Sequence, residues 1–377
     1  MKLGNFLADC ARRYPQRVAM VCGDETRTFA QLDSCATRLA NALRGRGLRY
    51  GDRVALLLPN CLEAVELMCA LGRAGAVIVP ISNRLAAAEV SFILGDCRPR
   101  FFVYHDADAV AHSLVPGLQI DAAFAVGAGG GDSLDALLAE GNDDAIEALP
   151  GDVEDLVLGY TSGTTGNPKG AIGTHACMVT GGGYMSGTEF GFTRDDKLLI
   201  TSPIAHRVGL TRVINVVCLG LSAVLMTRFD PTDAVDLIER HQITTISVVP
   251  TIARLLAPEL ERRSSACRSL TRLMATGEAF PVPLKQRLHA ALPWVGLHTS
   301  YAQTEAGLVA NLRPDEQLER PDSVGRPIPG VEVRLIDAQG HDVSTGEPGE
   351  VLVRFGQPGG PMVMRGYFER PEENAKV

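Results

Sequence analysis

Segments typical of buried strands alternate with segments typical of amphipathic helices along most of this 377-residue chain, and that alternation limits the folds open to it. Residues 53–58, 61–70 and 76–81 form one strand–helix–strand series with short connections. A series of this kind builds right-handed βαβ units around a parallel sheet. The pattern therefore predicts an α/β fold.

A second alternating block begins near Leu156, and within it the apolar stretch 213–226 predicts a buried helix that passes into a strand. Near the N-terminus, a β-hairpin is expected around Gly23 and Asp24, followed by a helix over 31–43. After Arg326 the sequence changes to short β-rich runs. The remaining expected elements are 197–200, 224–227, 234–240, 245–249, 272–276, 331–336 and 350–354.

These patterns predict two βαβ-type lobes with mixed, largely parallel sheets sandwiched by helices, plus a small β-barrel. The expected bounds are 1–150 for the first α/β lobe, 151–325 for the second and 326–377 for the β-rich subdomain. The glycine-dense segment 127–131 is expected to be a surface loop near the seam between the lobes.

The composition favours small-molecule chemistry in a reducing compartment. A hydrophobic fraction of 46% supports a large core, and a net charge of −8 argues against nucleic acid or an anionic membrane as the main partner. Nine scattered cysteines without a Cys-x-x-Cys pair indicate neither a zinc site nor a disulfide framework. The N-terminus lacks a signal-peptide pattern, and no apolar run is long enough to span a bilayer. A cytoplasmic protein without an integral membrane segment is expected, and a homodimer is left open.

The stretch 160–170 places hydroxyl groups, glycines and one cation directly after an apolar run. Glycines let backbone N–H groups approach phosphate oxygens, Ser and Thr hydroxyls add donors, and Lys169 supplies a charge that can follow leaving phosphates. The spacing Gly163-x-x-Gly166-x-x-Lys169-Gly170 does not match a Walker P-loop, which disfavours kinases and P-loop NTPases. A flexible Ser/Gly/Thr linker is the alternative. The stretch predicts a cradle for a nucleoside triphosphate.

This stretch closely resembles the phosphate loop of the adenylate-forming superfamily, which includes acyl-CoA synthetases, luciferases and the adenylation domains of peptide synthetases. Four later segments match the same superfamily in the right order, so the resemblance covers nearly the whole chain. They are 202–210, 275–280, 301–305 and 349–368. The chain looks most like an acyl-CoA synthetase, and specifically like the large N-terminal domain of one.

The resemblance implies roles for the matched residues. Tyr301 packs on the adenine, Thr304 hydrogen-bonds the α-phosphate and Glu305 holds Mg²⁺. His206 lies at the mouth of the acyl pocket, although a lone histidine is often structural. The implied catalytic set is Lys169, Thr304, Glu305 and His206. The implied nucleotide-binding set is Thr161, Ser162, Gly163, Thr164, Thr165, Gly166, Gly277, Glu278, Ala279, Tyr301, Ala302 and Gln303.

Purely structural alternatives to these roles remain. Glu278 could belong to an ordinary strand-to-helix turn, Glu305 could be a solvated loop carboxylate, and 349–368 has a mostly architectural role. Thr276 stands where the family has a glycine, and Gly277 still allows close backbone approach. Ala302 adds a methyl group where the family more often has glycine, which disfavours very long acyl chains.

The chain ends just before the family's ribose-binding aspartate, its hinge and its smaller C-terminal domain. We therefore expect a large N-terminal domain alone, which binds nucleotide weakly and turns over poorly.

The implied activity is that of an acid–thiol ligase, which uses ATP and Mg²⁺ to convert a carboxylic acid to an acyl-adenylate and then transfers the acyl group to coenzyme A. An adenylation domain that loads a carrier protein and a catalytically silent nucleotide-binding module are the alternatives. No clear aspartate lies in 208–217, which favours a plain acid over an amino acid. Arg207 and Arg212 could each pair with a second carboxylate of the substrate, or else be surface or ion-paired residues.

Overall fold

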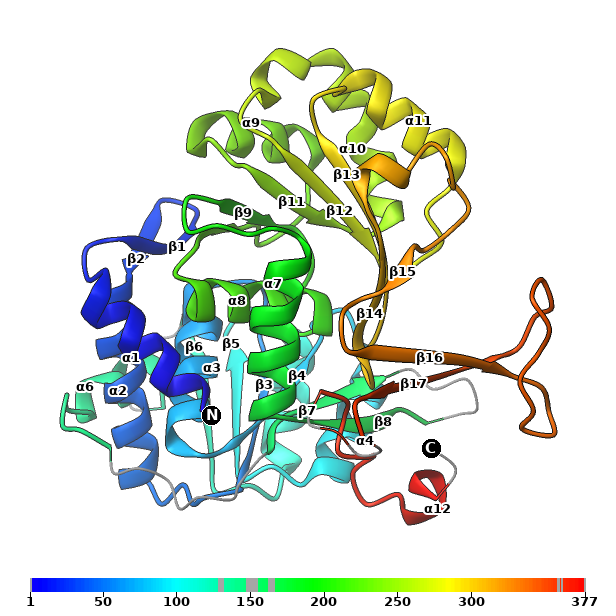
Figure 1. Cartoon of the computed structure of the whole chain (residues 1–377). Coiled ribbons are helices and arrows are strands. Elements are labelled where there is room, and N and C mark those ends of the chain that lie inside the picture. The colour runs from blue at the N-terminus through cyan, green and yellow to red at the C-terminus, as the bar shows by residue number, and fades with distance from the viewer. Residues whose placement is uncertain are drawn as a thin grey trace.

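The computed structural model describes residues 2–127, 132–146, 155–161, 167–357, 360 and 362–375. Two large sheets, each flanked by helices, form the body of the molecule, and a two-stranded sheet extends from it (Figure 1). Among the described residues, no helix is both long enough and apolar enough to cross a membrane.

Six strands make the first sheet: β3 (Arg53–Leu57), β4 (Val77–Ile81), β5 (Phe101–His105), β6 (Ala122–Val126), β7 (Asp155–Thr161) and β8 (Lys169–Thr174). Their order is β6-β5-β3-β4-β7-β8, and only the pair β7–β8 is antiparallel. Every residue of β4 is buried, as expected for a central strand covered on both faces. The helices of this half of the chain are α1 (Leu3–Arg13), α2 (Phe29–Gly45), α3 (Leu62–Ala74), α4 (Ala87–Cys97), α5 (Ala109–Leu114) and α6 (Leu134–Glu140).

Nine strands make the second sheet: β1 (Val18–Cys22), β2 (Glu25–Thr28), β9 (Lys197–Ile200), β10 (Ser222–Leu225), β11 (Thr245–Val248), β12 (Arg272–Thr276), β13 (Gly296–Gln303), β14 (Gly307–Leu312) and β15 (Arg326–Pro327). Their order is β15-β14-β13-β12-β11-β9-β10-β1-β2, parallel from β13 to β1 and antiparallel at both ends.

A π-helical segment, η2 (Cys177–Met185), leads directly into α7 (Ser186–Glu189), and α8 (Arg207–Leu219) packs against η2. The other helices are α9 (Pro231–His241), α10 (Pro250–Arg262), α11 (Val282–Ala291) and α12 (Pro371–Asn374). Single 3₁₀ turns are η1 (Val115–Gly117), η3 (Ser264–Cys267) and η4 (Pro314–Glu316).

The α/β class and the strand–helix alternation are confirmed. The N-terminal hairpin is β1–β2, the helix expected over 31–43 is α2, and the stretch 213–226 contains the end of α8 followed by β10. The two sheets do not divide at the lobe boundary expected at 150/151, because each sheet takes strands from both sides of it. Strands β1 and β2 belong to the nine-stranded sheet, and β7 and β8 belong to the six-stranded sheet.

The small β-barrel expected within 326–377 is not confirmed. There the described residues form a two-stranded antiparallel sheet, β16 (Val331–Ile336) and β17 (Glu350–Phe355). Each of these strands pairs with a single neighbour, whereas a barrel needs both edges of every strand paired. The surface loop expected at 127–131 lies outside the described residues, apart from Gly127.

One cluster of buried apolar side chains joins helices from distant parts of the chain. Leu7 of α1, Leu71 of α3 and Ile214 of α8 are fully buried within it. Full burial of a side chain of this size contributes about 1.5–3 kcal/mol. Because the three helices belong to different layers, this shared core fixes the two large sheets relative to one another.

Candidate functional site

The facing ends of β7 and β8 hold the stretch that carries the phosphate-loop resemblance. Thr161 ends β7 and lies opposite Lys169, which begins β8. The side of β7 away from β8 pairs in parallel with β4, so the connection between Thr161 and Lys169 leaves the carboxyl edge of the sheet. Ligand sites of open α/β sheets lie at that edge. Outside the described residues lie Ser162, Gly163, Thr164, Thr165 and Gly166.

Lys169 is held by two groups from the end of the described chain. Its ammonium donates a hydrogen bond to the Glu373 carboxylate at 2.5 Å and lies 5.5 Å from the centroid of the Tyr367 ring. The Lys169 side chain is 21% exposed, so the cation is neither buried nor freely solvated. A carboxylate therefore lies where an anionic ligand of Lys169 would bind.

Tyr367 also binds the second expected catalytic group. Its hydroxyl donates to the Glu305 carboxylate at 2.8 Å, and the backbone N–H of Met364 donates to the Glu305 carbonyl oxygen. Burial, together with the hydrogen bond to Glu305, raises the pKa of Tyr367 to about 12, so the phenol stays protonated at neutral pH.

Backbone pairing with β8 places Tyr367 at the site. Tyr367 forms a bridge with Ala171, and the Phe368 N–H donates to the Gly170 carbonyl oxygen at 2.8 Å. The sequence interpretation gave this segment a mostly architectural role and missed Tyr367. The backbone pairing that places Tyr367 joins distant parts of the chain, so no local pattern in the sequence marks it as a site residue.

The hairpin β13–β14 carries the motif 301–305. Tyr301, Ala302 and Gln303 end β13, Thr304 and Glu305 lie in the turn, and β14 begins at Gly307 with φ +70°. The Gln303 amide donates to the Tyr301 hydroxyl, and burial of the ring, with the nearby Glu305 charge, raises the pKa of Tyr301.

Thr304 connects this hairpin to β7 and α8. Its methyl group lies over Gly159 of β7, where an added Cβ would meet it at 3.5 Å. Its carbonyl oxygen accepts a hydrogen bond from Arg207 at 3.3 Å. Thr304 and Glu305 therefore lie beside the end of β7 that leads into the phosphate-loop stretch.

The segment 275–280 reaches the same edge of the nine-stranded sheet. Thr276 lies opposite Ser300 in the parallel pair β12–β13, and its hydroxyl donates to the Ser300 carbonyl oxygen. Gly277, with φ +91°, turns the chain out of the strand and leaves Gly277, Glu278 and Ala279 exposed. The Glu278 carboxylate accepts a hydrogen bond from Thr251 at 2.8 Å.

His206 lies at the N-cap position of α8, and its side chain is exposed. Partial removal of the ring from water by the surrounding protein, and then the nearby Arg84 charge, lower the pKa of His206. The lowered pKa favours the neutral imidazole at pH 7. Buried Asn60 positions this segment, because its amide donates to the carbonyl oxygens of Ser202 and Met226 and accepts from the Ile204 N–H.

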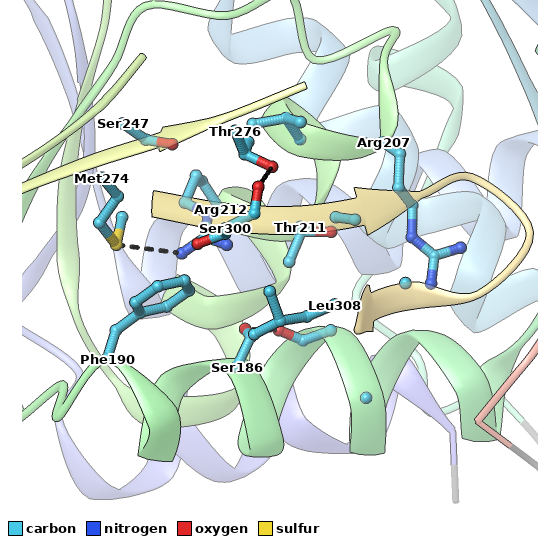
Figure 2. Close-up of a pocket in the computed structure, with 15 residues that line it drawn as sticks. Ser186, Phe190, Arg207, Thr211, Arg212, Ser247, Met274, Thr276, Ser300 and Leu308 are labelled. Carbon is cyan, nitrogen blue, oxygen red and sulfur yellow. Dashed lines mark hydrogen bonds between the residues drawn. The ribbon is translucent and has the colours of Figure 1, made fainter. Parts of the chain in front are cut away.

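A cavity opens between η2, α7, α8 and the ends of β12 and β13 (Figure 2). Its lining is largely apolar, with Arg207 toward the β13–β14 turn and Arg212 toward Phe190 and Met274 (Figure 2). Ala302, singled out in the sequence for its methyl group, lines the cavity. Apolar walls with a few polar groups suit the apolar part of a small organic ligand.

The structure thus brings Lys169, Thr304 and Glu305 to one site, with the cavity beginning at Arg207. The segment 277–279 directly follows β12, which pairs with β13. His206 directly precedes Arg207, the first residue of α8. Sequence reasoning missed Tyr367 and Glu373 as contacts of this site. Within the described chain, no group of three or more His, Cys, Asp and Glu side chains is arranged to hold a metal ion by itself.

Known proteins resemble the chain over nearly its full length. A family model described as AMP-binding enzyme matches residues 7–368. Feruloyl-CoA synthase from Amycolatopsis sp is 34% identical over 383 residues, which cover 100% of this chain and 73% of that protein. The 2-succinylbenzoate–CoA ligase of Bacillus subtilis (strain 168) is 30% identical over 378 residues, which cover 98% of this chain and 72% of the ligase.

Solved structures agree with these matches. The N-terminal domain of FACL13 from Mycobacterium tuberculosis has a TM-score of 0.90 and 28% identity, and the match covers 100% of this chain and 93% of that domain. The o-succinylbenzoate CoA synthetase of Bacillus subtilis, in complex with its acyl-adenylate intermediate, has a TM-score of 0.87 and 29% identity over 99% of this chain and 72% of that one. On the strength of the match over residues 7–368, the chain belongs to the family of AMP-binding enzymes.

Proposed function

We propose that this protein is an acid–CoA ligase, which activates a carboxylic acid with ATP and passes the acyl group to coenzyme A. The named relatives are themselves CoA synthases and CoA ligases of organic acids. The observation that carries the proposal is that Lys169, Thr304 and Glu305 lie at one site, beside a largely apolar cavity.

In the first step, a carboxylate oxygen attacks the α-phosphorus of ATP, and the bond to pyrophosphate breaks. In the second step, the thiol sulfur of coenzyme A attacks the acyl carbonyl carbon, loses its proton, and displaces AMP. Both steps depend on positioning and on stabilisation of phosphate charge, rather than on a covalent enzyme intermediate.

Each site residue has a proposed task in these steps. Lys169 pairs with the β- and γ-phosphates, which Thr161 and the loop residues 162–166 also contact. Thr304 donates to an α-phosphate oxygen. The Tyr301 ring packs on the adenine beside the exposed segment 277–279. His206 lies where the acid enters the cavity. Ala302 lines the cavity that holds the acid.

Glu305 suits a Mg²⁺ ion that is bound jointly by the protein and by ATP. Mg²⁺ prefers one or two carboxylates together with substrate phosphates over a site made of protein ligands alone. When bound there, Mg²⁺ would offset phosphate charge. Tyr367 binds one oxygen of the Glu305 carboxylate and orients the other. All nine cysteines are free thiols, which supports our further proposal of a reducing, cytoplasmic location.

The first experiment is ATP–pyrophosphate exchange with a panel of short, medium, branched and aromatic acids. It uses this chain and, in parallel, the chain extended by whatever coding sequence follows it. Acid-dependent exchange, followed by release of AMP that requires coenzyme A, supports the ligase. Release that requires a carrier protein instead would favour a loading domain. ATP binding without exchange for any acid would favour a silent nucleotide-binding module.

Lys169→Ala tests whether this site is the nucleotide site, with Lys197→Ala as the matched control. Lys197 is an exposed lysine whose ammonium donates to the His241 carbonyl oxygen. Only the Lys169 variant should weaken ATP binding, measured by calorimetry. Equal affinities for ATP in both variants would place the nucleotide elsewhere.

A further inference from the structure

Arg212 lies in the wall of the cavity, in the middle of α8, and is only 7% exposed. Its closest polar contact is a weak one, because the Met274 sulfur lies 4.0 Å from Nη1. The guanidinium carbon lies 5.3 Å and 5.7 Å from the ring centroids of Phe190 and Phe192. The surroundings of this cation are therefore two aromatic rings, a thioether and the cavity.

The Arg212 guanidinium is short of hydrogen-bond acceptors. The group carries five N–H donors. Its buried Nε atom has no acceptor, and in the described part of the chain neither a carboxylate nor a carbonyl oxygen accepts from the two terminal nitrogens. Burial lowers the pKa of Arg212 to about 10, so the group is still a cation at neutral pH.

Other half-buried arginines of this protein donate to oxygen acceptors: Arg53 and Arg207 bind backbone carbonyl oxygens, and several others pair with carboxylates. Arg27 donates to Glu66 at 2.7 Å, and Arg272 donates to Asp196 at 2.6 Å. An unpaired buried charge is costly, and proteins normally satisfy it with an opposite charge or a ligand. Arg212 departs from the pattern, and it does so in the wall of the proposed acid pocket.

The position of Arg212 relative to the reacting groups limits what it could bind. Arg207 donates to the carbonyl oxygen of Thr304, near the proposed site of the reacting carboxylate. Arg212 is five residues further along α8, which corresponds to about 7.5 Å along the helix axis. Figure 2 shows the two arginines at opposite sides of the cavity, with Leu308 and Thr211 between them. One aromatic ring or a few methylene groups would span this interval.

We propose that Arg212 binds a second carboxylate of the acid substrate, so that this protein is selective for dicarboxylic acids with a short apolar spacer. A guanidinium binds a carboxylate through two parallel N–H···O bonds, which suits a group with several unsatisfied donors. The apolar walls, including Phe190 and Met274, then contact the spacer. This inference rests on the proposed acid–CoA ligase function and specifies its substrate class.

The test compares acids that differ only in the second carboxylate. Suitable pairs are 4-carboxycinnamate with cinnamate, terephthalate with benzoate, and adipate with hexanoate, with 4-hydroxycinnamate as a neutral hydrogen-bonding analogue. Binding of each acid to the purified chain in the presence of ATP is measured by calorimetry, and ATP–pyrophosphate exchange is measured in parallel. We expect at least one diacid to be preferred over its matched monoacid by tenfold or more.

Two variants assign that preference to Arg212. Arg212→Met keeps an unbranched side chain against the same rings but removes the charge, whereas Arg212→Lys keeps the charge. Arg254→Met, at an exposed position on α10, is the matched control. The diacid preference should fall to near one in Arg212→Met, persist in part in Arg212→Lys and stay at the wild-type value in Arg254→Met.

Several outcomes would overturn the proposal. In the first, the wild-type protein prefers the monoacids or 4-hydroxycinnamate to the matched diacids. In the second, the Arg212→Met variant keeps the full preference for the diacid. The comparison of acids on wild-type protein does not depend on the variants folding. Failure of the ligase function itself looks different, because then no acid of either class supports exchange, whereas failure of this inference leaves exchange with monoacids intact.

Discussion

The Lys169 ammonium is paired with the Glu373 carboxylate, although 204 residues separate them in the sequence. If Lys169 binds the phosphates of ATP, this ion pair must break first. We therefore predict that Glu373→Gln tightens ATP binding. Both side chains are partly exposed, and such pairs contribute about 0–1 kcal/mol, so the gain should be about two- to fivefold.

Calorimetric titration of ATP into the Glu373→Gln variant measures this gain directly. Glu372→Gln is the matched control, because Glu372 is an exposed neighbour in the same short helix α12. Equal ATP affinities in the two variants would show that Glu373 does not compete with the nucleotide for Lys169.

Tyr367→Phe removes the hydroxyl that donates to Glu305. A hydrogen bond to a charged group contributes about 1.5–3 kcal/mol when buried. Because this pair is only partly buried, we expect a loss of about 1 kcal/mol in transition-state stabilisation, or about a fivefold lower kcat/KM. The Mg²⁺ concentration for half-maximal activity should rise, since Glu305 is less well oriented. Tyr104→Phe, which alters a tyrosine of β5, is the control; the same loss in both variants would contradict a specific role of Tyr367.

Local motifs allowed the sequence to single out Lys169, Thr304 and Glu305, which the structure brings close together. The motifs around Lys169, Thr304 and Glu305 each combine a turn with hydroxyl or charged groups, and such patterns are visible within a few residues. Tyr367 and Glu373 were not identified as site residues, because their significance depends on pairing with β8 and with Lys169 across long sequence separations. No local spacing encodes those contacts.

The environment of Arg212 could not be predicted for a related reason. Every residue of α8 from Gly209 to Cys218 is buried, so the helix has no exposed polar face against which an inward-facing arginine would stand out. The barrel expected near the C-terminus is not confirmed, because short β-rich runs predict strands but do not specify which strands pair. The α/β layers were predictable because strand and helix periodicities differ along the chain.

Asn60 is predicted to support the whole 202–210 segment. It is 5% exposed, and its side chain makes three hydrogen bonds, to Ser202, Met226 and Ile204. Asn60→Ala would leave buried backbone groups without partners, and we expect the free energy of unfolding to fall by about 3 kcal/mol. Urea unfolding measures this loss. The exposed Asn83→Ala is the control, and a loss below 1 kcal/mol in Asn60→Ala would contradict the role given to the side chain.

Stability is predicted to fall in mild acid because His298 is buried as a neutral imidazole. Burial lowers the pKa of His298 to about 4, with the Asn311 hydrogen bond offsetting part of this effect, while an unfolded histidine has a pKa of about 6.5. Between these values the unfolded chain binds a proton that the folded chain does not. Stability is therefore complete above pH 6.5 and decreases as the pH falls toward 4, by at most about 3 kcal/mol for this group.

Urea unfolding between pH 7 and pH 4.5 tests this dependence, and His298→Asn should flatten it. Part of the slope should remain in the variant, because burial also lowers the pKa of His175 to about 4. Glu66 acts in the opposite direction, since burial raises the pKa of its carboxyl group despite the bond from Arg27 and so favours the folded state in acid. The comparison of wild type with His298→Asn cancels this contribution. Identical slopes in the two proteins would therefore contradict a neutral, buried His298.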